Sequence, residues 1–431
     1  MPGAGPQTLS RTELDSGIRV LSEKVPGVRS VSLGIWIDAG SRDETDGEAG
    51  LAHFMEHLLF KGTDKLDARG IAEAFDNIGA DINAVTGKEY TSVYTRVLDR
   101  YLPDALSVMM DMVRKSVMAP DEIDSERKVV LEEIAMHMDS PDEMVHDHLA
   151  SAMWGDRSIG HMVLGEADVI KGVSRDELLG FRDSRYVGSR MVVTAAGAID
   201  HGPLVDAVSR GTEGVAPGTR ADRRGSLEDP LSGKSVFYKK TEQAHICLGS
   251  KGLRRNHPDR FALAVMDNML GGSMSSRLFQ SIREQKGLAY AIYSYSALFI
   301  GMGMVGIYCG THPDQAQEVV ELIEIELARV GESGFTDEEI ARAKNHITGS
   351  VYISMEDSGS RMNRMAKSEM TDGEHLTVEE MVSRVEGVRR ADLERVFVGT
   401  WGGAGLTLAV VGPFEEDAIK LTGRFEPGGP G

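Results

Sequence analysis

The sequence predicts an α+β fold of two related domains, each a mostly antiparallel sheet packed with helices. Three observations favour this fold. The chain has 431 residues, more than one hydrophobic core ordinarily serves. Strand-like and helix-like patterns follow one another along both halves of the chain. Two strand-like segments of the first half recur about 215 residues later, which indicates an internal duplication.

The repeat is visible at both ends of each half. Segment 30–34 resembles 244–249, with one residue of slippage, and segment 191–199 resembles 406–414. The letters agree weakly, but both pairs share nearly the same offset. We therefore predict a first domain over 1–212 and a second over 233–431. Between them, 213–232 is rich in Gly, Pro, Arg and Glu without apolar periodicity, as expected of a linker.

Within the first half, strands and helices are predicted from periodicity and from residues that favour element ends. Residues 30–37 alternate apolar with small or polar side chains, as in a sheet with one buried face. The expected strands are 17–25, 30–37, 80–86, 90–98 and 191–197, and the expected helices are 52–60, 67–79, 102–118 and 121–138.

Composition excludes some functions. The net charge of −20 argues against a nucleic-acid partner, whose binding protein would be basic. It fits either an acidic surface in water or an acidic cavity that prefers basic peptides. Cys247 and Cys309 are the only cysteines, so no disulfide framework is expected, and both fall in strand-like segments as core thiols.

Localisation is predicted from the absence of targeting and membrane signals. Residues 1–7 show no signal-peptide pattern, and no run of about twenty apolar residues occurs. We expect a cytoplasmic protein with no membrane partner.

The most informative stretch is residues 52–60, which contain His53, Glu56 and His57 in the order His-x-x-Glu-His. On a helix the two histidines lie one turn apart on the same face, so they could hold one divalent cation. Glu56 lies on the same side, where it could take a proton from water on the metal. The other residues of the segment are mostly apolar, and unpaired polar groups among them would cost several kcal/mol.

Two interpretations remain open for this motif taken alone. Both histidines could be ordinary core or surface residues. The order is also the inverse of the His-Glu-x-x-His pattern of many zinc peptidases. Catalytic zinc usually has three protein ligands and an open position, so the second interpretation requires a further ligand elsewhere in the chain.

Residues 125–134, within the helix predicted over 121–138, offer candidate ligands. Glu126 and Glu133 are seven residues apart and share a helix face, whereas Glu132 points about 100° away. Either Glu126 or Glu133 could bind the metal while the other supports the site. The alternative is an acidic helix in solvent, with Arg127 and Lys128 as intrahelical partners of its carboxylates.

These residues resemble the M16 metallopeptidases, which include pitrilysin, insulin-degrading enzyme and the mitochondrial processing peptidase. The resemblance rests on His53-x-x-Glu56-His57, on Glu133 lying 76 residues beyond His57, and on the sequence between Glu126 and Ile134. It implies that His53, His57 and Glu133 bind Zn²⁺, that Glu56 is the general base, and that Glu126 supports the site.

Two further matches follow from the same resemblance. Asn83 and Ala84 resemble the edge segment that pairs with the substrate backbone. Arg283 and Tyr290, seven residues apart in the second half, resemble the pair that reaches the scissile peptide, where a cation and a phenol could stabilise an oxyanion. Without the resemblance, Arg283 would be interpreted as a surface residue and Tyr290 as a core residue.

The resemblance implies a zinc endopeptidase or oligopeptidase that binds unfolded peptides as an added β-strand in a closed chamber. The family chamber needs four such domains, so this two-domain chain is expected to form a homodimer or a heterodimer with a related subunit. The second half has 265–272 at the place of the metal helix, without ligands, and is expected to be a degenerate, substrate-binding repeat. The alternative function is a non-catalytic peptide-binding subunit of a peptidase complex.

Overall fold

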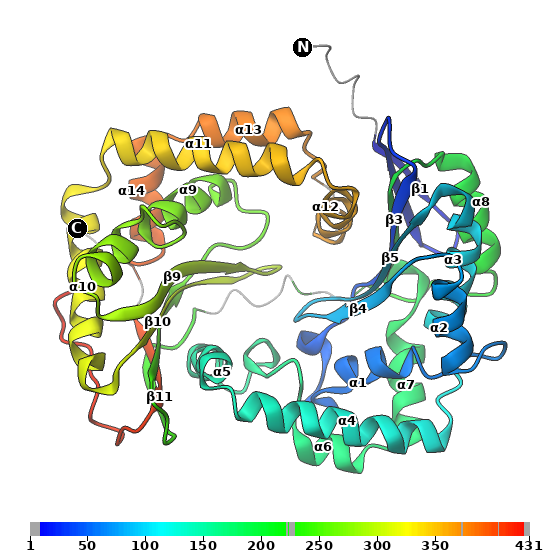
Figure 1. The fold of residues 1–431 in the computed structure, drawn as a ribbon, viewed down its shortest axis with the longest axis horizontal. Helices are drawn as coiled ribbons and strands as arrows, with labels where there is room; N and C mark the ends of the chain where they lie inside the picture. Colours follow the sequence, from blue (N-terminus) through cyan, green and yellow to red (C-terminus); the bar gives the residue numbers. More distant parts are fainter. Residues whose placement is uncertain (1–8, 221–222, 224–228, 372–373, 404, 426–431) are drawn as a thin grey trace. The chain divides into compact units, whose positions relative to one another are not determined.

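The computed structural model describes residues 9–220, 223, 229–371, 374–403 and 405–425. The chain divides into two compact units (Figure 1). The first unit is drawn from 1–135, 161–222 and 353–377, and the second from 136–160, 223–352 and 378–431. Residues 1–7, and part of the predicted linker (221–222 and 224–228), lie outside the described residues.

The first unit contains a six-stranded sheet in the order β1-β2-β6-β3-β5-β4. The β2–β6 pair is parallel, and the other pairs are antiparallel. Its strands are β1 (Leu9–Glu13), β2 (Arg19–Lys24), β3 (Ser30–Ile37), β4 (Ile82–Thr86), β5 (Thr91–Leu98) and β6 (Met191–Gly197). Strand β4 is therefore an edge strand of this sheet, as predicted for the segment that contains Asn83.

Helices of the first unit pack in two groups. One face packs against α2 (Ala68–Asp76), α3 (Leu102–Lys115) and α8 (His201–Gly211). A separate apolar cluster joins α1 (Leu51–Leu58) to α4 (Pro120–Met138), α6 (Ala167–Gly172) and α7 (Arg175–Arg185). Helix α1 also contacts β4, so the predicted metal helix lies beside the sheet edge (Figure 1).

The second unit repeats this architecture with a five-stranded sheet in the order β7-β11-β8-β10-β9. Here β7–β11 is the parallel pair, in the place that β2–β6 takes in the first unit. The strands are β7 (Gly233–Tyr238), β8 (Ala244–Lys251), β9 (Ala289–Leu298), β10 (Gly303–Thr311) and β11 (Thr407–Gly412). The matching strand order supports the duplication inferred from sequence.

The core of the second unit lies between one sheet face and five helices, with Cys309 buried in it. The helices are α9 (Arg260–Leu270), α10 (Ala316–Ser333), α11 (Asp337–Ser354), α13 (Val378–Glu386) and α14 (Arg390–Gly399). Cys247 lies on the opposite sheet face and is also buried. Both cysteines are free core thiols on strands, as predicted.

Two helices are exchanged between the halves of the sequence. Helix α5 (Pro141–Trp154) follows the first-half helices but packs on β8 and β11 of the second unit. Helix α12 (Ser358–Met370) comes from the second half but packs on β2, β3 and β6 of the first unit. The compact units therefore differ from contiguous halves of the sequence by these two segments, which the bounds 1–212 and 233–431 do not express.

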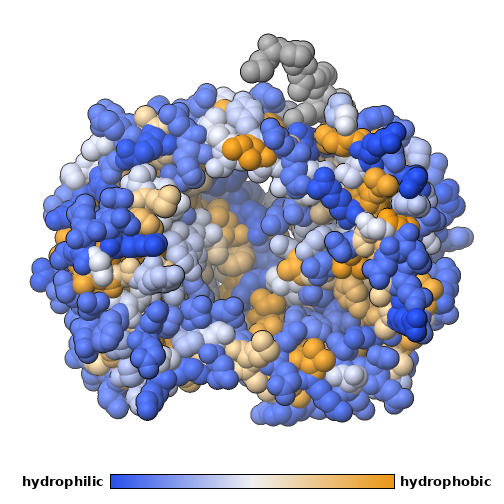
Figure 2. Space-filling model, viewed as in Figure 1, coloured by the Kyte–Doolittle hydropathy of each residue, from blue (hydrophilic) through white to orange (hydrophobic). Residues whose placement is uncertain are grey.

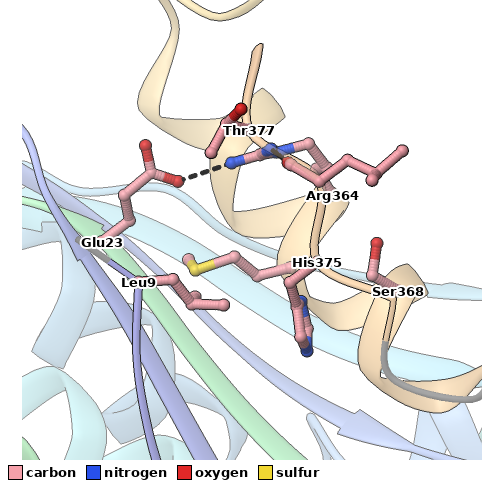
Figure 3. A pocket seen from close by; sticks show the side chains of 8 residues that line it. Leu9, Glu23, Arg364, Ser368, His375 and Thr377 are labelled. Carbon is pink, nitrogen blue, oxygen red and sulfur yellow. Dashed lines mark hydrogen bonds and ion pairs between the residues drawn. The ribbon is translucent and has the colours of Figure 1, made fainter. Parts of the chain in front are cut away.

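Helix α12 is fixed to the first sheet by buried ion pairs. Glu23 on β2 is 1% exposed and pairs with Arg361 and Arg364 of α12. Figure 3 shows the Glu23–Arg364 ion pair, which lines a small cavity of about 30 Å³. Glu369, near the end of α12, accepts hydrogen bonds from Arg11 on β1. No candidate site residue lines this cavity.

The α+β class and the two related domains are confirmed. Strand β1 was not predicted, while the β4–β5 hairpin and helices α3 and α4 fall within a few residues of their expected bounds. On the face drawn in Figure 2, hydrophilic side chains dominate and hydrophobic ones form small patches. Among the described residues, no helix has the length and apolar character needed to cross a membrane.

Candidate metal centre and catalytic site

Helix α1 begins after Gly50, whose backbone N–H donates a hydrogen bond to the Glu44 carboxylate. Gly50 is left-handed, with φ of 98°, and a Cβ there would lie 2.7 Å from the Leu164 carbonyl oxygen, so a larger residue is disfavoured. The Glu44 carboxylate accepts hydrogen bonds from the backbone N–H of Gly50 (2.9 Å) and Ala52 (2.7 Å). Two donors at the helix start are thereby satisfied, which fixes where the helix begins.

The residues of α1 divide between two faces. Leu51, Ala52, Phe54, Met55 and Leu58 are buried and pack against α4, α6 and α7. His53, Glu56 and His57 lie on the remaining face, at the spacing that the helix turn dictates. The apolar face therefore determines the orientation of the three polar side chains.

Helix α4 brings Glu133 to the two histidines. Glu133 Oε2 lies 3.6 Å from His53 Nε2 and 3.3 Å from His57 Nε2. One ligand atom from each residue lies within 4.8 Å of the others. Within the described parts of the chain, no other three His, Cys, Asp or Glu side chains group in this way. This is a donor set of two imidazoles and one carboxylate, as catalytic zinc sites use.

His53 has the protonation state that a ligand needs. Burial, with a smaller effect of His57, lowers the pKa of His53 to about 4, so the imidazole is neutral near pH 7. A neutral imidazole has a free lone pair for a metal ion. The buried Nδ1 of His53 has no hydrogen-bond partner among the described residues, so none of these residues fixes its tautomer. The residues present fit a divalent cation held by the Nε2 atoms.

His57 is oriented from behind by a short chain of contacts. Its Nδ1 lies 3.1 Å from Glu126 Oε2, and Glu126 Oε1 lies 2.6 Å from the Lys61 ammonium. Glu126 is nearly buried, at 7% exposure. A carboxylate on Nδ1 leaves Nε2 of His57 free to face Glu133, which is the usual arrangement behind a metal-bound histidine. Glu126 is the residue for which the family resemblance implies a supporting role.

Glu56 is held by Thr86 of the edge strand β4. The Thr86 hydroxyl donates to Glu56 Oε2, and the Thr86 backbone also hydrogen-bonds the carboxylate. Burial raises the pKa of Glu56, opposed by Thr86 and His57, while Glu133 raises it further. A carboxylate whose pKa is raised is a stronger base at neutral pH.

Asn83 and Ala84 lie on β4, three and two residues before Thr86. Asn83 is exposed, and its Oδ1 accepts a hydrogen bond from the Ala84 backbone N–H at 2.8 Å. In the described sheet, β4 pairs with β5 on one side and ends the strand order. The edge can therefore accept a further extended chain.

Arg283 and Tyr290 lie in the second unit and form a pair of their own. Arg283 is on a short π-helical segment, Phe279–Glu284, with its guanidinium 4.7 Å from the Phe279 ring and 5.9 Å from the Tyr290 ring. Tyr290 is 79% exposed at the start of β9, beside a register shift between Gly310 and Thr311 of β10. Such irregularities turn a side chain away from its regular position.

Three residues of this site were not predicted as functional: Lys61, Thr86 and Glu44. Lys61 follows His57 by four residues, a spacing that could have suggested a contact near the helix end. Thr86 is an ordinary strand residue, and Glu44 lies in a polar loop. Their contacts arise from the fold, and no local pattern indicates them.

Comparison with known protein families gives two matches that together cover most of the chain. Residues 19–167 match the family described as insulinase, peptidase family M16. Residues 172–347 match the peptidase M16 inactive domain. The first match includes His53, Glu56, His57 and Glu133, and the second includes Arg283 and Tyr290.

Similar proteins extend over nearly the full length. An uncharacterized zinc protease of Streptomyces coelicolor is 41% identical over 95% of this chain and 90% of its own. The uncharacterized zinc protease YmxG of Bacillus subtilis is 41% identical, covering 90% of this chain and 94% of its own. A protease from Helicobacter pylori has the same fold, with a TM-score of 0.88 and 20% identity over 94% of this chain and all of that one.

Proposed function

Because the chain belongs to the M16 family of peptidases, we propose that it is a zinc-dependent endopeptidase or oligopeptidase acting on unfolded peptides. The observation that carries the proposal is the meeting of His53, His57 and Glu133 at one point beside Glu56. These are the residues that the motif and its resemblance assigned to metal binding and to proton transfer.

The proposed ligands are His53 Nε2, His57 Nε2 and a Glu133 carboxylate oxygen. Their chemistry and spacing suit zinc, and the relatives from Streptomyces and Bacillus are named zinc proteases. When bound, zinc supplies Lewis acidity, which polarises a carbonyl oxygen and acidifies water.

Glu56 is proposed to move the proton. Its carboxylate lies on the same face of α1 as both histidines, so it can accept a proton from the attacking water and pass it to the leaving amine. The Thr86 hydroxyl donates to Oε2 of this carboxylate, and so orients the carboxylate for this exchange. The raised pKa of Glu56 favours its action as a base.

The substrate is proposed to bind as an additional strand on the edge of β4. Main-chain hydrogen bonds would then supply affinity with little dependence on side-chain identity. Ala84 N–H, which donates to the Asn83 side chain, would donate to the peptide instead. Since Thr86 of β4 hydrogen-bonds Glu56, a peptide bound along this edge would lie beside the Glu56 carboxylate.

Arg283 and Tyr290 are proposed to stabilise the oxyanion that develops at the scissile carbonyl. The exposed phenol and the neighbouring guanidinium suit this role. A closed chamber, a homodimer or heterodimer, and a cytoplasmic location complete the proposal; the first two rest on the family resemblance. Sedimentation velocity across a concentration series tests the dimer.

The proposal is tested with a quenched fluorescent peptide of ten to twenty residues. We expect the purified protein to contain about one zinc per chain and to cleave the peptide. A chelator should abolish cleavage, and added zinc should restore it. Cleavage that survives complete zinc removal would refute the zinc mechanism. Zinc binding and peptide binding without any cleavage would instead indicate the non-catalytic, peptide-binding subunit.

A further inference from the structure

Lys61 occupies a constrained position just beyond the metal helix. Its backbone N–H donates to the Leu58 carbonyl, and Gly62, with φ of 114°, then turns the chain. Two contacts hold this turn: the Ser116 hydroxyl donates to Leu58 O at 2.7 Å, and Val117 N–H donates to Gly62 O at 3.1 Å. The backbone of Lys61 is therefore fixed between the end of α1 and the segment that leads into α4.

From this position the Lys61 side chain reaches the carboxylate behind His57. Its ammonium lies 2.6 Å from Glu126 Oε1, while Glu126 Oε2 lies 3.1 Å from His57 Nδ1. Lys61 is 28% exposed and Glu126 is 7% exposed, so the pair is screened from most solvent. One carboxylate oxygen is held by the lysine, and the other oxygen is thereby directed at the imidazole.

We infer that Lys61 is a positioning residue for the metal centre, acting through Glu126 to hold His57 Nε2 toward the metal. The inference rests on the proposed zinc function. Lys61 is not one of the candidate ligands, and its ammonium contacts Glu126.

If charge alone mattered, removal of the Lys61 ammonium would strengthen zinc binding, which is the opposite of what the positioning role predicts. An ammonium near a dication repels it, so a variant without the charge would bind zinc more tightly if charge alone mattered. If Lys61 positions Glu126, removal of the lysine frees the carboxylate to rotate, and zinc binding weakens. Loss of a partner behind a metal-bound histidine typically weakens metal affinity by about 10–100-fold.

The experiment measures zinc affinity by competition with a chromophoric chelator at fixed pH. Lys61→Met should weaken zinc binding about tenfold, at the lower end of that range because the lysine acts through Glu126. Lys61→Arg keeps a cation and its donors and should fall within about threefold of the wild type. In a Glu126→Gln background, Lys61→Met should change the affinity by less than about twofold, because the carboxylate it positions is gone.

Lys65 offers a matched control. Its ammonium also lies 2.6 Å from a carboxylate, that of Asp111, which contacts none of the candidate ligands. Lys65→Met removes the same charge four residues away and should leave zinc affinity unchanged. The melting temperature of each zinc-free variant is measured as well, and Lys61→Gln replaces Lys61→Met in the comparison if the latter does not fold.

The possible results distinguish a failure of the proposed role of Lys61 from a failure of the proposed zinc function. A wild-type protein that binds no zinc refutes the proposed function and the role of Lys61 together. A wild-type protein that binds zinc, beside a Lys61→Met variant that binds it equally well or more tightly, refutes only the role of Lys61. Equal weakening in Lys61→Met and Lys65→Met also refutes it, because the effect would then be general.

Discussion

The anchoring of α12 on the first unit can be tested through Glu369. This side chain is 5% exposed and accepts hydrogen bonds from Arg11 Nη2 at 3.0 Å and Arg11 Nε at 3.2 Å. His375 Nε2 lies 2.9 Å from its other oxygen. Burial raises the pKa of Glu369, but His375 and Arg11 outweigh burial and lower it to about 2.

Arg19 contributes less to this cluster than its burial suggests. Its Nη1 lies 3.7 Å from the Glu369 carboxylate, and burial, with repulsion from Arg220, lowers the pKa of Arg19 to about 10. The loss of hydration on burial therefore affects the pKa of Arg19 more than the attraction of the Glu369 carboxylate does. The favourable interactions of the Glu369 carboxylate come mainly from Arg11 and His375.

The lowered pKa implies a pH-dependent contribution to stability. An unfolded glutamate has a pKa of about 4.3, so a folded pKa of about 2 corresponds to about 3 kcal/mol. Because the folded pKa is the lower one, this stability is fully present above pH 4.5. It is lost as the pH falls from about 4.5 toward 2.

The assay is urea unfolding of the zinc-free wild type and of Glu369→Gln between pH 2 and pH 7. The difference in unfolding free energy should be about 3 kcal/mol at pH 7 and close to zero at pH 2. Glu332→Gln, at an exposed position of α10, is the matched control and should show no such pH-dependent difference. A difference for Glu369→Gln that stays constant across this pH range would refute the reasoning.

Three further predictions concern the site. Thr86→Val removes the hydroxyl that donates to Glu56, so kcat should fall about tenfold or more with zinc content unchanged; an unaltered kcat would contradict the role of Thr86. Glu44→Ala leaves the backbone N–H groups at the start of α1 without their acceptor and should lower stability by about 2 kcal/mol, measured by denaturant unfolding. Tyr290→Phe should lower kcat/KM about 10–100-fold while zinc binding stays intact, and full activity in this variant would exclude the phenol from the reaction.

The candidate metal ligands could be predicted from the sequence because helix geometry constrains their spacing. Residues four apart on α1 and seven apart on α4 must share a helix face, so His53 with His57, and Glu126 with Glu133, were predictable as pairs. Geometry left open which glutamate would face the histidines. The resemblance favoured Glu133, and the structure brings Glu133 to both Nε2 atoms and Glu126 to Nδ1 of His57.

The exchange of α5 and α12 was not predictable from pattern. The apolar periodicity of an amphipathic helix predicts that one face is buried, but it does not indicate which sheet that face packs against. In α12, Met362, Met365 and Ala366 would suit either sheet. The specific partners are ion pairs such as that between Glu23 and Arg364, which are 341 residues apart in the chain.

The supporting contacts of the site were missed for a similar reason. Lys61 and Thr86 each act through a single side chain, with no repeated spacing to mark them. Strand β1 was missed because it is short and none of its five residues is fully buried, so its pattern is weak. Tertiary structure determines all three features.

The most direct test of the central claim compares the wild type with Glu56→Gln in peptide cleavage and in zinc content. Gln keeps the size of the side chain and loses the carboxylate that accepts the proton. The account predicts about one zinc per chain in both proteins and cleavage by the wild type alone. Cleavage by Glu56→Gln at a rate near that of the wild type, with zinc bound, would contradict the assignment of Glu56 as the base.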